Sequence, residues 1–126
     1  MNITGHSFLG STRADDSSQT FHVSNAATGE PLEPAFHSAS TEDLEKAVSL
    51  ATQAFSSYSS VAPETRAEFL RTIAEKIDAL GDEITPRMMA EAGLPEPRCN
   101  GERGRTCGQL RMFAGLIEEG SWVDAR

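Results

Sequence analysis

Residues 63–81 read PETRAEFLRTIAEKIDALG and carry the clearest structural pattern in this chain. Apolar residues recur there at spacings of three and four, which places them on one face of an α-helix. These residues are Phe69, Leu70, Ile73, Ala74, Ile77 and Leu80. Pro63 suits a first turn, where its missing N–H has no helical partner, and Gly81 is expected to close the helix. The stretch therefore predicts a helix with one apolar stripe.

A second amphipathic helix is predicted upstream, from Ser40 to the serine-rich tract at residues 56–60. Ser40 can cap its first turn, and Glu42 and Asp43 suit the positive end of its dipole. Its apolar residues again share one face: Leu44, Ala47, Val48, Ala51, Phe55 and Tyr58. We expect this stripe and the stripe of residues 69–80 to face each other or a shared sheet.

Two further helices are predicted downstream. Asp82 is expected to cap a short helix that ends at Gly93-Leu94-Pro95, provided that Pro86 falls in its first turn. The last helix is predicted over residues 96–119 and carries a stripe of glycines, each of which costs about 1 kcal/mol relative to alanine. These are Gly101, Gly104, Gly108 and Gly115. Close approach of another backbone or of a ligand explains them; the alternative is a frayed, partly irregular segment.

Strand and turn chemistry dominates the residues before the first helix. We expect strands at Ile3-Thr4, at Phe8-Leu9, over residues 19–24 and over residues 32–37, with a polar, flexible stretch over residues 10–18. Residues 25–31 form a turn in which Gly29 supplies a positive φ, and Pro34 marks an edge or a bulge. The predicted fold class is α+β, with strands and turns over residues 1–38 and a helical portion over residues 39–126.

The composition excludes several classes of protein. The 126 residues carry 11 Lys and Arg against 19 Asp and Glu, a formal charge of -8, which disfavours nucleic acid as a partner. Apolar runs are far shorter than the ~20 residues that a membrane span needs, and the N-terminus lacks the pattern of a signal peptide. We therefore expect a cytoplasmic protein of one ordinary-sized domain at most.

No motif in the sequence brings catalytic groups together. Cys99 and Cys107 would lie roughly 12 Å apart along one helix, so we interpret them as two reduced thiols. His6, His22 and His37 lack the short spacings of zinc ligands, and we predict no metal site. Nearby arginines could lower a thiol pKa, but we do not assign a catalytic cysteine.

Four arginines form a basic cluster in this otherwise acidic chain: Arg98, Arg103, Arg105 and Arg111. A guanidinium can pair with a small carboxylate or with an acidic partner surface. Pairing within the chain, with neighbours such as Glu102, is an equal alternative.

Several segments, taken in order, resemble the N-terminal quarter of the aldehyde dehydrogenase superfamily. They are a first ribbon, Asn25-Ala26-Ala27-Thr28-Gly29-Glu30, the helix from Glu42-Asp43-Leu44 to Ala54-Phe55, Arg66 to Ile77, Glu91-Ala92-Gly93-Leu94-Pro95, and Leu110 to Gly115. The tract 101–111, together with Ile3-Thr4-Gly5-His6, resembles the branch that oxidises 2,5-dioxopentanoate, also called α-ketoglutaric semialdehyde, often with NADP.

The resemblance implies that this chain is the opening part of a cofactor-binding domain, an incomplete α/β fold without the catalytic domain. The family's nucleophilic cysteine, general-base glutamate and cofactor-binding strands would all follow Arg126, so we assign no catalytic, cofactor-binding or metal-binding residue here. Arg105 matches a position at the substrate entrance, where it could pair with the distal carboxylate of the semialdehyde.

The expected function is therefore that of an N-terminal fragment, which provides scaffold in a full-length enzyme that uses NADP or NAD. The fragment alone is expected to bind no cofactor and to perform no catalysis. Its expected partners are the remainder of the parent chain, a small carboxylate-bearing aldehyde and, in isolation, other copies of itself. A stand-alone helical interaction module and an arginine-based binder of small acids are the alternatives.

Overall fold

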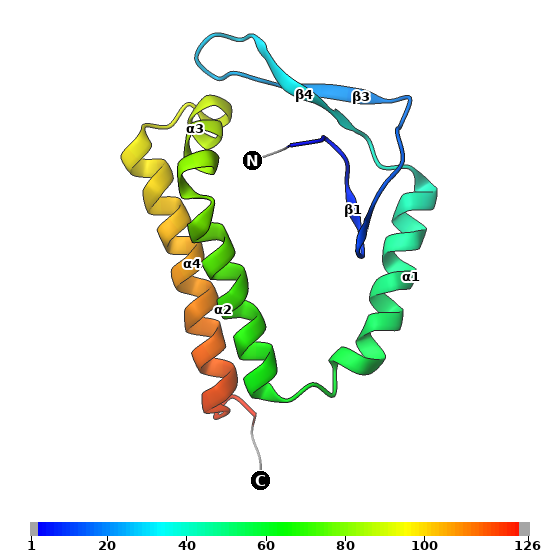
Figure 1. The fold of residues 1–126 in the computed structure, drawn as a ribbon, viewed down its shortest axis with the longest axis vertical. Coiled ribbons are helices and arrows are strands. Elements are labelled where there is room, and N and C mark those ends of the chain that lie inside the picture. The colour runs from blue at the N-terminus through cyan, green and yellow to red at the C-terminus, as the bar shows by residue number, and fades with distance from the viewer. Residues whose placement is uncertain (1–2, 124–126) are drawn as a thin grey trace. The chain divides into compact units, whose positions relative to one another are not determined.

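Strands occupy the first part of the chain and helices the rest, as the sequence predicts. The computed structural model describes residues 3–123, which hold four helices and two antiparallel strand pairs (Figure 1). This confirms the α+β class. Contacts group residues 3–60 and 61–123 into two compact units. A domain boundary at residue 38 stays a prediction, because the first unit also includes the first helix.

The main strand pair is the hairpin of β3 (Thr20–Ser24) and β4 (Pro31–His37). At its turn Gly29 has φ 76°, and Asn25 Oδ1 accepts the N–H groups of Ala27 and Thr28 at 2.9 and 3.3 Å. Phe21 pairs with Phe36 but Val23 pairs with Leu32, so the register shifts between these two pairs. The bulge that Pro34 predicts is thus confirmed, because Pro34 lies within the shifted part of β4.

The N-terminal segment differs from the prediction. Ile3-Thr4 is not a strand, and the stretch predicted to be flexible contains β2 (Thr12–Arg13), which pairs with β1 (Phe8–Leu9). The reason is a tight turn: Gly10 has φ 61°, and Thr12 Oγ1 donates to the Leu9 carbonyl at 3.0 Å. Gly5 (φ 74°) is buried, and its carbonyl accepts the N–H of His37 at 2.9 Å.

Helix α1 (Thr41–Tyr58) begins with the predicted cap at Ser40. The N–H of Asp43 donates to Ser40 Oγ at 3.0 Å, and the N–H of Ser40 donates to Asp43 Oδ2 at 2.9 Å. The Ser40 hydroxyl also donates to Asp43 Oδ2, at 2.9 Å, and the two hydrogen bonds that Ser40 donates to this carboxylate lower the pKa of the Asp43 carboxyl. No residue of α1 is buried, and Phe55 is 70% exposed. Because α1 and α2 belong to different units, the pairing of their stripes stays a prediction.

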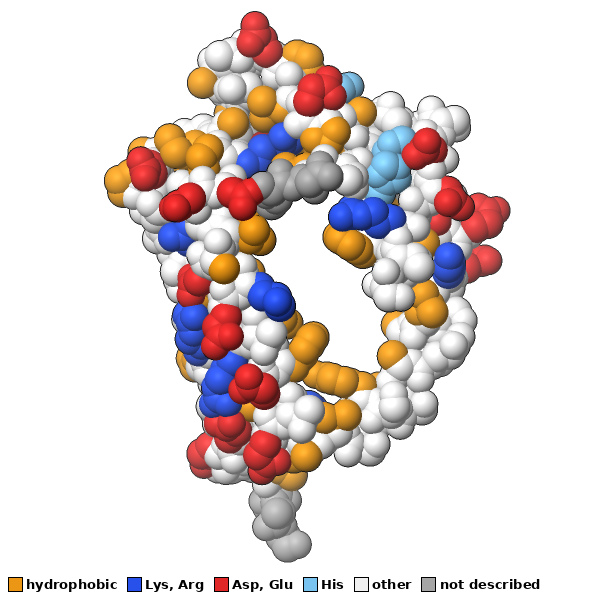
Figure 2. Space-filling model, in the orientation of Figure 1, with side chains coloured by type: hydrophobic (Ala, Val, Ile, Leu, Met, Phe, Trp, Pro, Cys, Tyr) orange, Lys and Arg blue, Asp and Glu red, His pale blue; other side chains and the backbone are white. Residues whose placement is uncertain are grey.

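The second unit is built on α2 (Pro63–Ala79) and α4 (Glu96–Glu119), which lie side by side (Figure 1). Small residues fill the seam between them: Ala67, Ala74, Cys107 and Ala114 are at most 1% exposed. Small side chains let two helix backbones approach closely, so this seam is tight and offers little room for larger groups. Acidic and basic side chains are interspersed along the outside of this helix pair (Figure 2).

The link between α2 and α3 (Gly81–Ala92) corrects three predictions. Gly81 does not close α2 but starts α3, directly after Leu80. Asp82 makes no capping hydrogen bond, and Pro86 lies inside α3 rather than in its first turn. Gly81 instead lies directly against the Arg103 guanidinium, which would have to shift to admit a side chain, because an added Cβ would lie 2.1 Å from Arg103 Nη1. No local pattern could reveal this contact with α4.

The end of α3 and the extent of α4 agree with the sequence. Gly93 ends α3 in the left-handed conformation, φ 66°, and α4 is regular from residue 96 to residue 119. Within the described residues of the helical unit, a Cβ at any of the four glycines of α4 would meet nothing within 4 Å, so close approach of another backbone or of a ligand stays a prediction. None of the described helices is long and apolar enough to span a membrane.

Candidate functional site

The structure disperses the predicted arginine cluster over different faces of α4. Arg98 pairs with Glu102 at 2.5 Å, and Arg111 pairs with Asp78 of α2 at 2.6 Å. The hydrogen bond from Arg111 lowers the pKa of the Asp78 carboxyl and raises that of the Arg111 guanidinium. For these two arginines, pairing within the chain is the correct alternative.

Arg105 is exposed, and the structure gives it no polar partner among residues 3–123. It lies two residues from both Arg103 and Cys107, which corresponds to roughly 200° around the helix. Arg105 therefore points away from the seam with α2, on the same side of α4 as Gly101, Gly108 and Met112. Its guanidinium is available to an anion that approaches this side of the helix.

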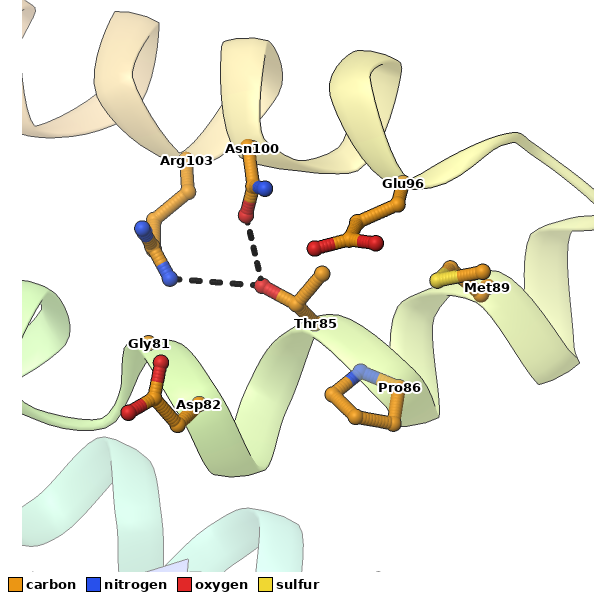
Figure 3. A pocket seen from close by; sticks show the side chains of 8 residues that line it. All are labelled: Gly81, Asp82, Thr85, Pro86, Met89, Glu96, Asn100 and Arg103. Atoms are coloured by element: carbon orange, nitrogen blue, oxygen red, sulfur yellow. Dashed lines mark hydrogen bonds between the residues drawn. The ribbon is translucent and has the colours of Figure 1, made fainter.

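Arg103 instead joins α4 to α3 through a chain of hydrogen bonds in a pocket of about 280 Å³ (Figure 3). Its Nη1 donates to Thr85 Oγ1 at 3.2 Å, and the Thr85 hydroxyl donates to Asn100 Oδ1 at 2.9 Å. Thr85 is only 5% exposed, so both of these hydrogen bonds offset the cost of burying its hydroxyl.

The pocket carries charge of both signs but no activated nucleophile. Figure 3 shows the carboxylates of Asp82 and Glu96 on opposite sides of Thr85. The one hydroxyl at the centre is occupied as donor and as acceptor, and no histidine lines the pocket. The arrangement holds α3 against α4, so the role of these hydrogen bonds is structural.

Both cysteines are buried in the helical unit. Cys99 is 0% and Cys107 1% exposed, and the Cys107 thiol donates to the Ala74 carbonyl at 3.5 Å. Burial, together with a hydrogen bond to Asp78, raises the pKa of the Cys107 thiol. The suggestion that neighbouring arginines could activate a thiol is therefore wrong for Cys107, because burial and Asp78 outweigh the opposing effect of Arg111 and Arg103.

The geometry of the pocket indicates no reaction, but the sequence matches a known family. The sequence model of the aldehyde dehydrogenase family matches residues 13–123, which is most of the chain. The chain belongs to the aldehyde dehydrogenase family. The matched residues include the β3–β4 hairpin and helices α1 to α4.

Two relatives of this aldehyde dehydrogenase chain are named for one activity. It is 41% identical, across 99% of its length, to alpha-ketoglutaric semialdehyde dehydrogenase 2 of Azospirillum brasilense. It is 35% identical, across 97% of its length, to the alpha-ketoglutaric semialdehyde dehydrogenase of Acinetobacter baylyi. A third relative, succinate-semialdehyde dehydrogenase [NADP(+)] 2 of Schizosaccharomyces pombe, is 31% identical over 76% of the chain. The chain spans about a quarter of the first two relatives, 24% and 23%.

Sequence reasoning missed the Thr85, Asn100 and Arg103 network in this aldehyde dehydrogenase segment. The available signal was the spacing of three between Asn100 and Arg103, which puts both side chains on one face of α4. Nothing in the sequence connects that face with Thr85, because the contact depends on how the chain turns after α3 and brings α4 back alongside it.

Proposed function

We propose that this chain is the N-terminal framework of an NAD(P)-dependent aldehyde dehydrogenase that oxidises α-ketoglutaric semialdehyde to 2-oxoglutarate. The observation that carries the proposal is the 41% identity across 99% of the chain with a relative named for that substrate. On its own the chain acts as scaffold and does not catalyse. The nicotinamide cofactor, the nucleophile and the general base belong to the remainder of the full-length enzyme, which we place in the cytoplasm.

Two structural features support a scaffold role. The cysteines within residues 3–123 are held in the helix seam or beside it, where the Cys107 thiol has a raised pKa. A thiol in that state is a poor nucleophile at neutral pH. In addition, α1 leaves large apolar side chains uncovered, including Leu44 at 62% and Val48 at 58% exposed, as expected of a segment that needs further chain to cover it.

Within this proposal, Arg105 binds the substrate's distal carboxylate. Arg105 is exposed on the side of α4 opposite the seam. Among the described residues it has no polar partner, so binding a carboxylate would not break an existing contact. A charge-assisted contact of this kind contributes about 1.5–3 kcal/mol, which corresponds to roughly a 10- to 150-fold effect on binding.

The test is a chimera in which this chain replaces the matching N-terminal part of the Azospirillum brasilense enzyme. We expect the chimera to oxidise α-ketoglutaric semialdehyde, and the Arg105→Ala chimera to lose about 10- to 150-fold in kcat/KM for it. An aldehyde of similar length without a carboxylate should be affected little by Arg105→Ala. Parallel assays with NAD and NADP determine the cofactor preference.

Arg98→Ala is the matched control, because Arg98 lies on the same helix but already pairs with Glu102. Equal losses for Arg98→Ala and Arg105→Ala, or equal losses for charged and uncharged aldehydes, would remove the carboxylate role of Arg105. A folded chimera without any dehydrogenase activity would contradict the larger proposal, as would turnover by the 126-residue chain alone.

The isolated chain is also predicted to self-associate. Its exposed apolar side chains on α1 and α4, such as Phe55 at 70% and Met112 at 57%, would be partly covered by contact with another copy. Sedimentation velocity over a range of concentrations should show species larger than the monomer. A compact monomer at high concentration would instead favour a stand-alone module.

A further inference from the structure

Three ionisable side chains from separate segments meet at the end of β4. They are His6 of the N-terminal segment, Asp16 of the connection between β2 and β3, and His37, the last residue of β4. The two imidazole rings stack with centroids 4.2 Å apart and planes 20° apart. His6 Nε2 lies 2.8 Å from Asp16 Oδ1, and the backbone N–H of Ser17 donates to His37 Nδ1 at 2.9 Å.

The hydrogen bonds fix which ring nitrogens carry protons. A backbone N–H can only donate, so His37 Nδ1 must accept, and the proton of the neutral His37 ring therefore lies on Nε2. Asp16, when ionised, can only accept, so His6 Nε2 carries a proton. The residue types are those of a metal site, but these protons leave His37 no free lone pair for an ion while Ser17 is bound. Two nearly parallel stacked rings also do not direct their in-plane lone pairs to one point.

We propose that His37 is a proton-operated latch that holds the connection between β2 and β3 on the end of β4. Neutral His37 accepts the Ser17 N–H, and a proton on Nδ1 turns this acceptor into a donor, so that the bond is lost. The same proton places positive charge face to face with the His6 ring, which itself faces the carboxylate of Asp16. Protonation of His37 therefore releases Ser17, because the protonated ring has no lone pair left at Nδ1 to accept its N–H.

Release of Ser17 would act at a point where backbone hydrogen bonds join several segments. Its backbone N–H binds the Gly5 carbonyl at 2.9 Å, and next to it the Ser38 N–H binds the Gln19 carbonyl at 2.9 Å. The N-terminal segment, the connection at residues 14–19 and β4 thus meet at one residue. Of the other charged groups nearby in sequence, Arg13 on β2 donates to Thr4 Oγ1 at 2.7 Å, and Glu33 on β4 lies by His22 at 3.8 Å.

The Asp16 carboxylate lies near both rings, because one ligand atom from each of the three side chains falls within 4.8 Å of the others. Its hydrogen bond with His6 lowers the pKa of the Asp16 carboxyl, and attraction to His37 and to His6 lowers it further. A measurement of global stability would mix the effects of all three groups, whereas the Ser17 amide reports directly on its own bond to His37 Nδ1.

The test is amide hydrogen exchange of the ¹⁵N-labelled 126-residue chain from pH 8 to pH 5, corrected for the intrinsic exchange rate. We expect the protection factor of Ser17 to fall roughly five- to tenfold as the pH decreases, the factor expected for one neutral hydrogen bond. His37→Gln should abolish this pH dependence, because its amide oxygen can accept the Ser17 N–H at every pH. His22→Gln, in the β3–β4 hairpin but outside the cluster, should leave it intact.

Three results would overturn the latch. One is a Ser17 protection factor that does not change with pH in the unmodified chain. Another is a change that persists in His37→Gln. The third is micromolar binding of Zn²⁺ at pH 7.5 that is lost in His37→Gln, because it would show that the ring nitrogen is free for a metal and not committed to Ser17.

Discussion

Gly5→Ala is expected to destabilise the strand unit by about 2–5 kcal/mol, the sum of a left-handed backbone penalty and an overpacked contact. Gly5 has φ 74°, which side chains rarely tolerate, and an added Cβ would lie 2.0 Å from the carbonyl oxygen of Ala35. That neighbour is backbone of β4, so it cannot rotate away as a side chain can. Relief requires the N-terminal segment to move and to give up the Gly5–His37 hydrogen bond.

Gly29→Ala provides the matched control, since Gly29 has almost the same backbone conformation (φ 76°) and nothing within 4 Å of an added Cβ. It should lose only the conformational term, about 1–2 kcal/mol. Urea unfolding followed by far-ultraviolet circular dichroism, with amide exchange of β4 to locate the effect, compares the two variants. Equal losses at both positions would show that the contact with Ala35 contributes nothing.

Ala74→Leu should have a comparably large effect on the helical unit. Ala74 is 0% exposed in the seam between α2 and α4, and its carbonyl accepts the thiol of Cys107. Three additional carbons have no space there, so the helices must separate at a cost of about 1–3 kcal/mol or more. The separation would also strain the Arg71–Glu118 and Arg111–Asp78 pairs, which join the same two helices.

Ala79→Leu introduces the same side chain at an exposed position near the end of α2 and should change stability by less than about 0.5 kcal/mol. Thermal unfolding of both variants, monitored at the helical circular dichroism band, separates overpacking from helix propensity. If Ala74→Leu melted at the same temperature as Ala79→Leu, the seam would be looser than its buried alanines indicate.

Local chemistry accounts for the part of this fold that could be predicted. The Ser40 cap, the turn at Gly29, the stop at Gly93 and the regular helix at 96–119 each depend on residues close together in sequence, and each is confirmed. The wrong predictions had both local and distant causes: the strand at Thr12–Arg13 depends on the tight turn at Gly10, whereas the role of Gly81 depends on a distant contact. Gly81 looks like a helix terminator until Arg103 of another helix is placed beside it.

The features of the candidate site were likewise predictable only in part. Arg105 is exposed on a helix, as periodicity alone indicates, but its proposed role comes from the family resemblance and stays a prediction. The partners of Arg103 and Arg111 lie on α3 and α2, 18 and 33 residues away in sequence. His6 and His37 are 31 positions apart, so spacing gave no reason to join them, and only the folding of the N-terminal segment onto β4 does so.

The buried thiol of Cys107 makes opening of the helical unit measurable by chemical labelling. A disulfide reagent such as an aromatic thiol-exchange dye cannot reach a sulfur that is 1% exposed, so labelling must wait until α2 and α4 part. Under conditions where re-closure outpaces labelling, the rate of colour development measures the fraction of molecules in which this unit is open, without any introduced probe.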